Sequence, residues 1–191
     1  VVNFLHAMQD RPGLASGAKL AAVTTISFDI AVLELLLPLA VGAEIVLATR
    51  EQATDGTQLA GLLAQHRATL MQATPATWRM LLETGWTGGA GLTALCGGEA
   101  LPRDLAGELV GRVGALWNMY GPTETTVWST CWQVRDPRRG IAIGRPIANT
   151  QVHVLDPQGR PCAVGVPGEA FIGGAGVALG YHGREALTAE R

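Results

Sequence analysis

The sequence predicts an α/β fold: a mostly parallel sheet flanked by helices, followed by a smaller β-rich, barrel-like subdomain. Up to residue 135, short apolar runs alternate with segments of helical period, which is typical of buried parallel strands covered on both faces. Beyond residue 135, alternating segments are separated by Gly and Pro at short intervals, which indicates antiparallel β structure. The chain has 191 residues, of which 48% are hydrophobic and 16% charged, so a sizeable core is expected.

The individual elements follow from apolar spacing and from residues that begin or end helices. Apolar residues at helical spacing predict a helix over 1–8, which the Arg-Pro-Gly run at 11–13 would end. Ser27 or Asp29 is suited to cap a second helix, and Gly42 is suited to end it. Further helices are expected over 55–66, from Pro75 at a first turn, and over 102–110. Continuous apolar runs predict strands over 20–23, 44–48, 68–71, 92–96 and 114–118.

The boundary between the two subdomains is expected at the turn 136–140, which divides the chain into 1–135 and 136–191. In the second part, 147–155 alternates and 169–172 forms another strand. We expect the first subdomain to carry the functional residues, because loops at the carboxyl ends of parallel strands hold the ligands of such sheets.

Composition excludes several classes of function. A net charge of −2 leaves no basic face large enough to neutralise several phosphates, which argues against a nucleic-acid partner. Cys96, Cys131 and Cys162 are odd in number and lack CxxC spacing, which favours reduced thiols in a cytoplasm over disulfides or a zinc site. The apolar stretch 30–47 is interrupted by charged residues and a proline, so no membrane span is expected.

The segment Asn118–Thr126, NMYGPTETT, groups hydroxyls and a carboxylate on a turn that directly follows an apolar run. Backbone amides and Thr hydroxyls suit phosphate oxygens, and the carboxylate of Glu124 suits Mg²⁺. The ring of Tyr120 is suited to stack on a base. A Thr-rich turn that simply enters a strand is the alternative interpretation of the same residues.

Two other segments are candidates for the same site. Gly97 and Gly98 follow a strand and permit a close backbone approach to a flat ligand, although paired glycines alone are a weak signal. Asp29 lies in an apolar neighbourhood, as a helix cap or as a buried anion that awaits a cationic ligand group.

Together and in this order, these segments resemble the adenylation domains of nonribosomal peptide synthetases, which belong to the adenylate-forming superfamily. The resemblance is carried by Phe28-Asp29, by Asn-x-Tyr-Gly-Pro-Thr-Glu at 118–124, and by the glycine-rich stretch 168–181 with Leu-Thr-x-Glu-Arg at 187–191. It implies amino-acid activation: a carboxylate and ATP give an acyl-adenylate and pyrophosphate. The acyl group then passes to the phosphopantetheine thiol of a peptidyl carrier domain, with condensation domains adjacent in the same synthetase.

The resemblance also implies roles for single residues. Tyr120 would stack on adenine and Asn118 would bond its amino group. Thr123 and Glu124 are implied as catalytic residues, Thr123 at the phosphates and Glu124 as the Mg²⁺ ligand. The residues implied around ATP are Gly98, Glu99, Ala100, Asn118, Tyr120, Gly121 and Thr123.

Alignment by these motifs also implies a substrate pocket, with Asp29 facing the ammonium group of an amino acid. Its residues are Asp29, Ile30, Leu33, Gln72, Leu95, Gly97, Met119, Val127 and Trp128. Read in order they give DILQLGMVW, which resembles the signature of glycine-activating domains. Bulky side chains around the pocket favour a small substrate, and alanine is the nearest rival of glycine.

Two further hypotheses stay open. One is an acyl- or aryl-CoA ligase of the same superfamily, for which an anion such as Asp29 would have no partner. The other is a non-catalytic nucleotide-binding module. The family's phosphate loop with its lysine is expected before Val1, and the ribose-binding aspartate and catalytic lysine after Arg191, because Lys19 matches neither lysine. The isolated 191-residue chain is therefore expected to be inactive.

Overall fold

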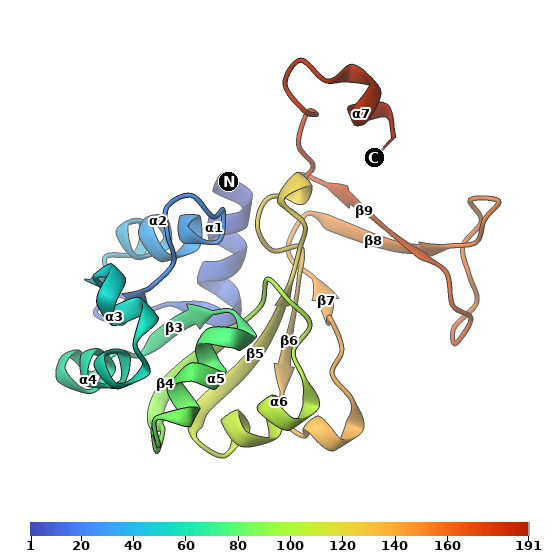
Figure 1. Ribbon diagram of the computed structural model, residues 1–191. Coiled ribbons are helices and arrows are strands. Elements are labelled where there is room, and N and C mark those ends of the chain that lie inside the picture. Colours follow the sequence, from blue (N-terminus) through green and yellow to red (C-terminus); the bar gives the residue numbers. More distant parts are fainter. Residues whose placement is uncertain (191) are drawn as a thin grey trace.

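The computed structural model describes residues 1–190, and two sheets organise them. The large sheet has seven strands in the order β2-β1-β3-β4-β5-β6-β7 (Figure 1). Its strands are β1 (Lys19–Ala22), β2 (Glu44–Leu47), β3 (Leu70–Ala73), β4 (Gly89–Cys96), β5 (Val113–Tyr120), β6 (Thr130–Val134) and β7 (Arg145–Pro146). Strands β2, β1, β3, β4 and β5 pair in parallel, whereas β6 and β7 pair antiparallel. The predicted α/β fold with a mostly parallel sheet is confirmed.

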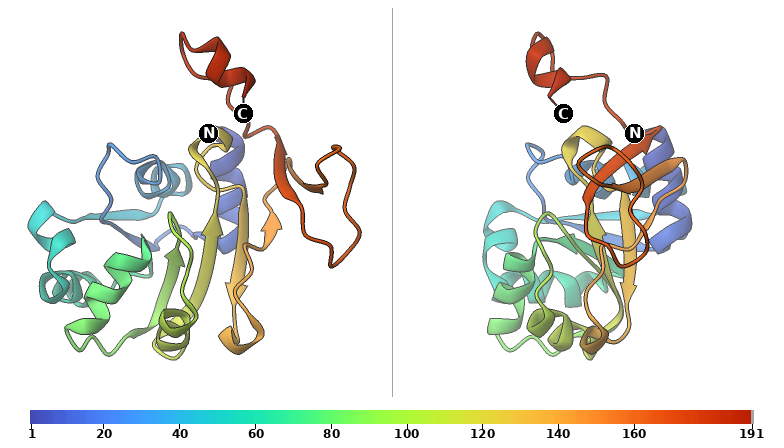
Figure 2. Two further views of the ribbon diagram at one scale, coloured as in Figure 1. Left: turned by 45° about the vertical axis from the view of Figure 1, so that its right-hand side comes forward. Right: turned by 90° about the vertical axis from the view of Figure 1, so that its right-hand side faces the viewer.

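Helices cover both faces of the large sheet. They are α1 (Val2–Met8), α2 (Ala31–Val41), α3 (Arg50–Thr54), α4 (Gly56–His66), α5 (Pro75–Glu83) and α6 (Arg103–Val110). Alternate strand residues face opposite layers: Leu20 belongs to the buried cluster that includes α1 and α2, whereas Ala21 belongs to the cluster that includes α4, α5 and α6. Figure 2 shows α1 and the α4–α6 layer on opposite sides of the sheet. Burial on both faces explains why these strands are continuously apolar in the sequence.

Local signals set most helix ends, with one correction. Pro75 occupies the first turn of α5, and Gly42 ends α2 with a left-handed φ of 73°, as predicted. Neither Ser27 nor Asp29 caps α2: the N-cap is Ile30, which makes no side-chain cap hydrogen bond. The carboxylate of Asp29 instead accepts a hydrogen bond from the hydroxyl group of Thr123. No helix within residues 1–190 is long and apolar enough to cross a membrane.

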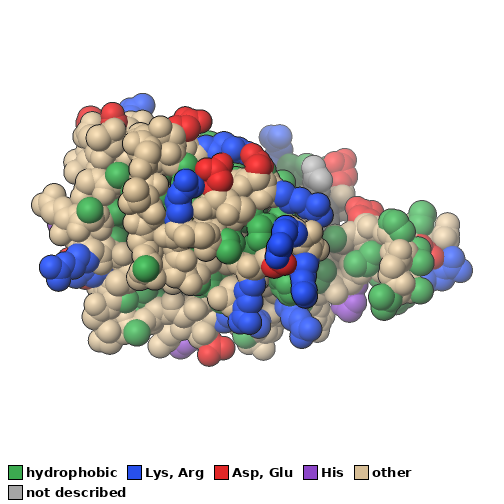
Figure 3. Space-filling view, turned by 90° about the horizontal axis from the view of Figure 1, so that it is seen from below, with side chains coloured by type: hydrophobic (Ala, Val, Ile, Leu, Met, Phe, Trp, Pro, Cys, Tyr) green, Lys and Arg blue, Asp and Glu red, His purple; other side chains and the backbone are tan. Residues whose placement is uncertain are grey.

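The second sheet is an antiparallel pair, β8 (Thr150–Leu155) with β9 (Glu169–Gly174), followed by α7 (Glu185–Ala189). The pair projects from the large sheet, and hydrophobic side chains gather at its far end (Figures 1 and 3). Within residues 1–190, every buried hydrophobic side chain lies at or before Ile147. The described part of this β-rich segment therefore has no core of its own. Because β7 pairs with β6, the large sheet extends beyond residue 135; the division into 1–135 and 136–191 stays a prediction.

Candidate functional site

The predicted site residues meet where the parallel strands end. Strand register aligns Ala73 with Cys96 and Cys96 with Asn118, so the segments that follow β3, β4 and β5 emerge at one edge. A cavity of about 400 Å³ opens there between the ends of β4 and β5. It is lined by Gly98, Glu99, Ala100, Asn118, Met119, Tyr120, Gly121, Pro122, Trp128 and Ile143. The structure thus brings two separate sequence segments, 98–100 and 118–122, into one cavity.

The cavity is lined by the aromatic ring of Tyr120 and the side-chain amide of Asn118. Tyr120 is 38% exposed, which leaves its ring available to a ligand. Asn118 is 6% exposed, and its Nδ2 donates a 2.8 Å hydrogen bond to the Ala142 carbonyl. With Nδ2 engaged, Oδ1 is the atom that can accept a hydrogen bond from a ligand amino group. Gly98 adopts a φ of 83°, a left-handed conformation that favours glycine at this position of the cavity wall.

The turn between β5 and β6 carries Thr123 and Glu124, and its backbone is strained at the two residues Thr126 and Val127. Thr123–Thr125 forms a single 3₁₀ turn, after which Thr126 and Val127 take φ values of 65° and 67°. Consecutive β-branched residues in the left-handed region are rare, because the branched Cβ crowds the backbone. The Ser129 amide donates to the Tyr120 carbonyl at 2.9 Å, which closes the turn and offsets part of that cost.

Thr123 connects this turn to Asp29. Its Oγ1 donates a 2.6 Å hydrogen bond to Oδ2 of Asp29, across 94 residues of sequence. Asp29 lies just before α2, and Thr123 just after β5. The residue implied at the phosphates and the residue implied at the substrate ammonium are therefore direct neighbours. This contact replaces the helix-cap interpretation of Asp29.

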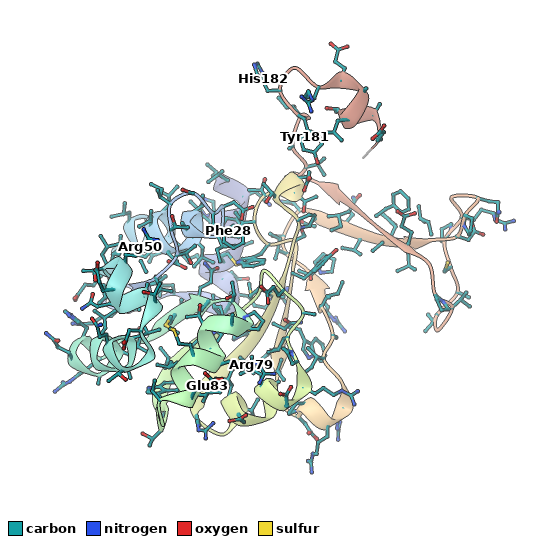
Figure 4. All side chains as sticks on the ribbon, viewed as in Figure 1. Phe28, Arg50, Arg79, Glu83, Tyr181 and His182 are labelled. Atoms are coloured by element: carbon teal, nitrogen blue, oxygen red, sulfur yellow. The ribbon has the colours of Figure 1, made fainter. Side chains whose placement is uncertain are left out.

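Glu124 contacts the glycine-rich segment that follows β9. The phenol of Tyr181 donates a hydrogen bond to Oε1 of Glu124, and Tyr181 extends from this segment toward the turn (Figure 4). The amide of Ala178 donates to the Glu124 carbonyl at 2.8 Å, and Oγ1 of Thr126 donates to the Gly176 carbonyl at 2.7 Å. Sequence reasoning missed these contacts, although it had singled out the 168–181 stretch.

The chemistry of the donor set fits a magnesium ion shared with a nucleotide. Within residues 1–190 no group of three or more His, Cys, Asp and Glu residues is arranged to hold a metal. Mg²⁺ needs no such cluster, since it is commonly bound by one or two carboxylates together with substrate phosphates and water. Glu124, in the turn between β5 and β6, would supply one such carboxylate.

The residues implied around the substrate side chain form a tightly packed cluster. Seven of them are almost completely buried, with exposures of 0–3%: Ile30, Leu33, Gln72, Leu95, Met119, Val127 and Trp128. A Cβ on Gly97 would lie 2.6 Å from Cη2 of Trp128 and 2.7 Å from the Met119 carbonyl oxygen. The indole of Trp128 therefore lies directly against the backbone of Gly97. A side chain at position 97 would therefore clash with the indole of Trp128.

Glu34 is the buried charge that sequence reasoning left unassigned. It lies on α2, is fully buried, and accepts hydrogen bonds from Thr24 and from Gln72. Burial raises the pKa of its carboxyl group, and these hydrogen bonds partly counteract that shift. A charged residue within an apolar helical segment is the signal that could have identified it. On the opposite face of the sheet, burial raises the pKa of the Cys96 thiol to about 12, which excludes a thiolate nucleophile there.

Comparison with known proteins identifies the family. Residues 1–182 match the family model described as AMP-binding enzyme. The chain belongs to this family. It is 45% identical over 190 residues, 99% of its length, to the dimodular nonribosomal peptide synthase of Bacillus subtilis (strain 168). It is also 42% identical over 192 residues to a PKS-NRPS hybrid synthetase of Aspergillus candidus. The chain spans 8% of the length of each of these two relatives.

Solved structures agree with this assignment. A four-domain nonribosomal peptide synthetase bound to AMP and glycine matches 98% of the chain with a TM-score of 0.94 and 52% identity, over 14% of its own chain. The N-terminal subdomain of NpsA from Klebsiella oxytoca, in complex with 3-hydroxyanthranilyl-AMSN, matches with a TM-score of 0.81 and 25% identity. The AMP-binding domain described here is therefore of the nonribosomal peptide synthetase type.

Proposed function

We propose that this AMP-binding domain activates glycine: glycine and ATP give glycyl-AMP and pyrophosphate. The glycyl group then passes to the phosphopantetheine thiol of an adjacent peptidyl carrier domain for use by a condensation domain. The observation that carries the choice of substrate is the buried indole of Trp128, which packs so closely on Gly97 that an added Cβ would lie 2.6 Å from Cη2. An indole in this place would leave space in the pocket only for a small substrate. The relative with a TM-score of 0.94 was bound to AMP and glycine, which supports the same choice.

In the proposed arrangement, each residue at the carboxyl ends of the strands binds a different group of ATP or glycine. The adenine ring would enter the 400 Å³ cavity against Tyr120, with its amino group facing Oδ1 of Asn118. Thr123 would donate to a phosphate oxygen, and Glu124 would hold Mg²⁺, which neutralises charge on the phosphates during the attack of the carboxylate. Asp29 would bind the ammonium group of glycine. The protein thereby orients the carboxylate toward the α-phosphate.

Asp29 favours an amino acid over the acyl group of a CoA ligase. Its carboxylate accepts a hydrogen bond from Thr123 and is half-buried beside the apolar pocket. An ammonium group would pair with this anion, whereas a fatty or aryl acid would leave it without a cationic partner. Amino-acid-dependent ATP–pyrophosphate exchange by the completed domain, without any requirement for CoA, tests this choice. Exchange that depended on a simple fatty or aryl acid would support the ligase instead, and no exchange with any acid would support a non-catalytic module.

Replacing Asp29 by alanine in the completed domain should weaken glycine binding by about 2–5 kcal/mol, because a desolvated charge pair is broken. Acetate, the des-amino analogue of glycine, should lose much less. Inhibition constants or KM values for both ligands, measured on Asp29→Ala and on the more conservative Asp29→Asn, give the comparison. Equal losses for glycine and acetate would remove Asp29 from the ammonium site.

A further inference from the structure

A buried carboxylate lies behind the pocket cluster. Glu34 is 0% exposed, and its Oε2 accepts 2.9 Å hydrogen bonds from the amides of Val23 and Thr24. Its Oε1 accepts a 2.6 Å hydrogen bond from Oγ1 of Thr24. These contacts tie α2 to the end of β1. One further donor reaches the carboxylate from β3, and this donor belongs to the substrate pocket.

That donor is the side-chain amide of Gln72, which links the carboxylate of Glu34 to the indole of Trp128. Nε2 of Gln72 donates to Oε1 of Glu34 at 3.0 Å and to the Ile30 carbonyl at 2.8 Å. Oε1 of Gln72 accepts a 2.7 Å hydrogen bond from Nε1 of Trp128. Gln72 is itself fully buried, so water cannot replace either partner. The result is a continuous chain from carboxylate to indole.

The ends of this chain determine the orientation of the amide in its middle. An ionised carboxylate only accepts hydrogen bonds, and an indole N–H only donates them. Gln72 can therefore satisfy both ends in one orientation alone, with Nε2 toward Glu34 and Oε1 toward Trp128. The opposite orientation would place two acceptors together at Glu34 and two donors together at Trp128.

We propose that Glu34 is a positioning residue for substrate selection, which acts through Gln72 to hold the Trp128 indole against Gly97. The indole lies directly against Gly97, where an added Cβ would be 2.6 Å from Cη2. Held there, it would fill space that a substrate side chain needs. A glutamine at position 34 would bring a donor into a site where every present partner donates, so at least one contact of residue 34 would be lost and Gln72 would be held less firmly. This inference rests on the proposed activation of glycine.

The experiment compares glycine and alanine as substrates of the completed domain, with and without Glu34→Gln. The ratio of kcat/KM for glycine to that for alanine should fall roughly tenfold in the variant, because the indole is no longer held in one place. The change should lie mainly in a lower KM for alanine. Leu59→Ala, which opens a cavity in the core on the opposite face of the sheet, serves as the matched stability control and should leave the ratio unchanged.

A double variant separates positioning through the indole from a general structural effect. In Trp128→Phe the N–H at the end of the chain is missing, so adding Glu34→Gln should change the glycine to alanine ratio little further. Gln72→Met interrupts the chain at its middle and leaves the contacts of Glu34 with Val23 and Thr24 in place. It should reproduce the loss of selectivity even if Glu34→Gln fails to fold.

The outcomes distinguish the two proposals. If the unmodified domain prefers another amino acid, the assignment of glycine fails. If it prefers glycine but both Glu34→Gln and Gln72→Met keep the ratio, the positioning role of Glu34 is wrong. Additive effects of Glu34→Gln and Trp128→Phe would likewise contradict a route through the indole.

Discussion

Glu124→Gln should lower the turnover of the completed domain by roughly 100-fold at limiting Mg²⁺, which corresponds to about 3 kcal/mol of transition-state stabilisation. A neutral amide holds a hard cation poorly, so the ion that neutralises the phosphates would be bound less often and less firmly. Turnover measured against Mg²⁺ concentration should show a raised requirement for the ion, with partial recovery at high Mg²⁺.

Tyr181→Phe is the matched control for this prediction. It removes the phenol that donates to Oε1 of Glu124 but leaves the carboxylate in place. The Mg²⁺ dependence of Tyr181→Phe should therefore stay much closer to that of the unmodified domain. A Glu124→Gln variant with an unchanged rate at limiting Mg²⁺ would exclude Glu124 as the metal ligand.

Trp128→Leu should open the pocket and abolish most of the preference for glycine over alanine. Exclusion of one methyl group by crowding is worth about 1–3 kcal/mol, or about 10–200-fold in kcat/KM, and this preference should fall toward unity. Larger aliphatic amino acids should then become substrates. The measurement is kcat/KM for glycine, alanine and valine on the same variant.

Trp78→Leu controls for the loss of a buried indole as such. Trp78 is also fully buried, and its Nε1 donates to the Leu95 carbonyl, but its ring packs in the core on the opposite face of the sheet. Both substitutions should reduce stability by a few kcal/mol. Only Trp128→Leu should change the substrate profile. An unchanged profile in Trp128→Leu would remove Trp128 from the pocket wall.

Much of the fold could be predicted from local patterns in the sequence. The apolar runs that became β3, β4 and β5 indicate strands buried on both faces, and Pro75 and Gly42 mark helix ends for local steric reasons. The turn at 118–124 stands out because its polar groups follow an apolar strand directly. Such signals need only a few neighbouring residues.

The contacts that define the site could not be predicted in the same way. Thr123 reaches Asp29, and Gln72 reaches Glu34, only because strand pairing places the ends of β1, β3 and β5 at the same edge of the sheet, and α2 follows β1 there. Continuous apolar runs, which mark strands buried on both faces, do not encode which strands become neighbours. The left-handed backbone of Val127 even opposes local propensity, since β-branched residues avoid that region. The tertiary structure imposes it.

The substrate profile of the completed domain decides whether it activates glycine. ATP–pyrophosphate exchange should be measured with each of the twenty amino acids at equal concentration, and with acetate as the des-amino control. Glycine should give the highest rate, alanine should follow at a lower rate, and acetate should give almost none. A preference for any amino acid with a large side chain would contradict the assignment of glycine and the role given to Trp128.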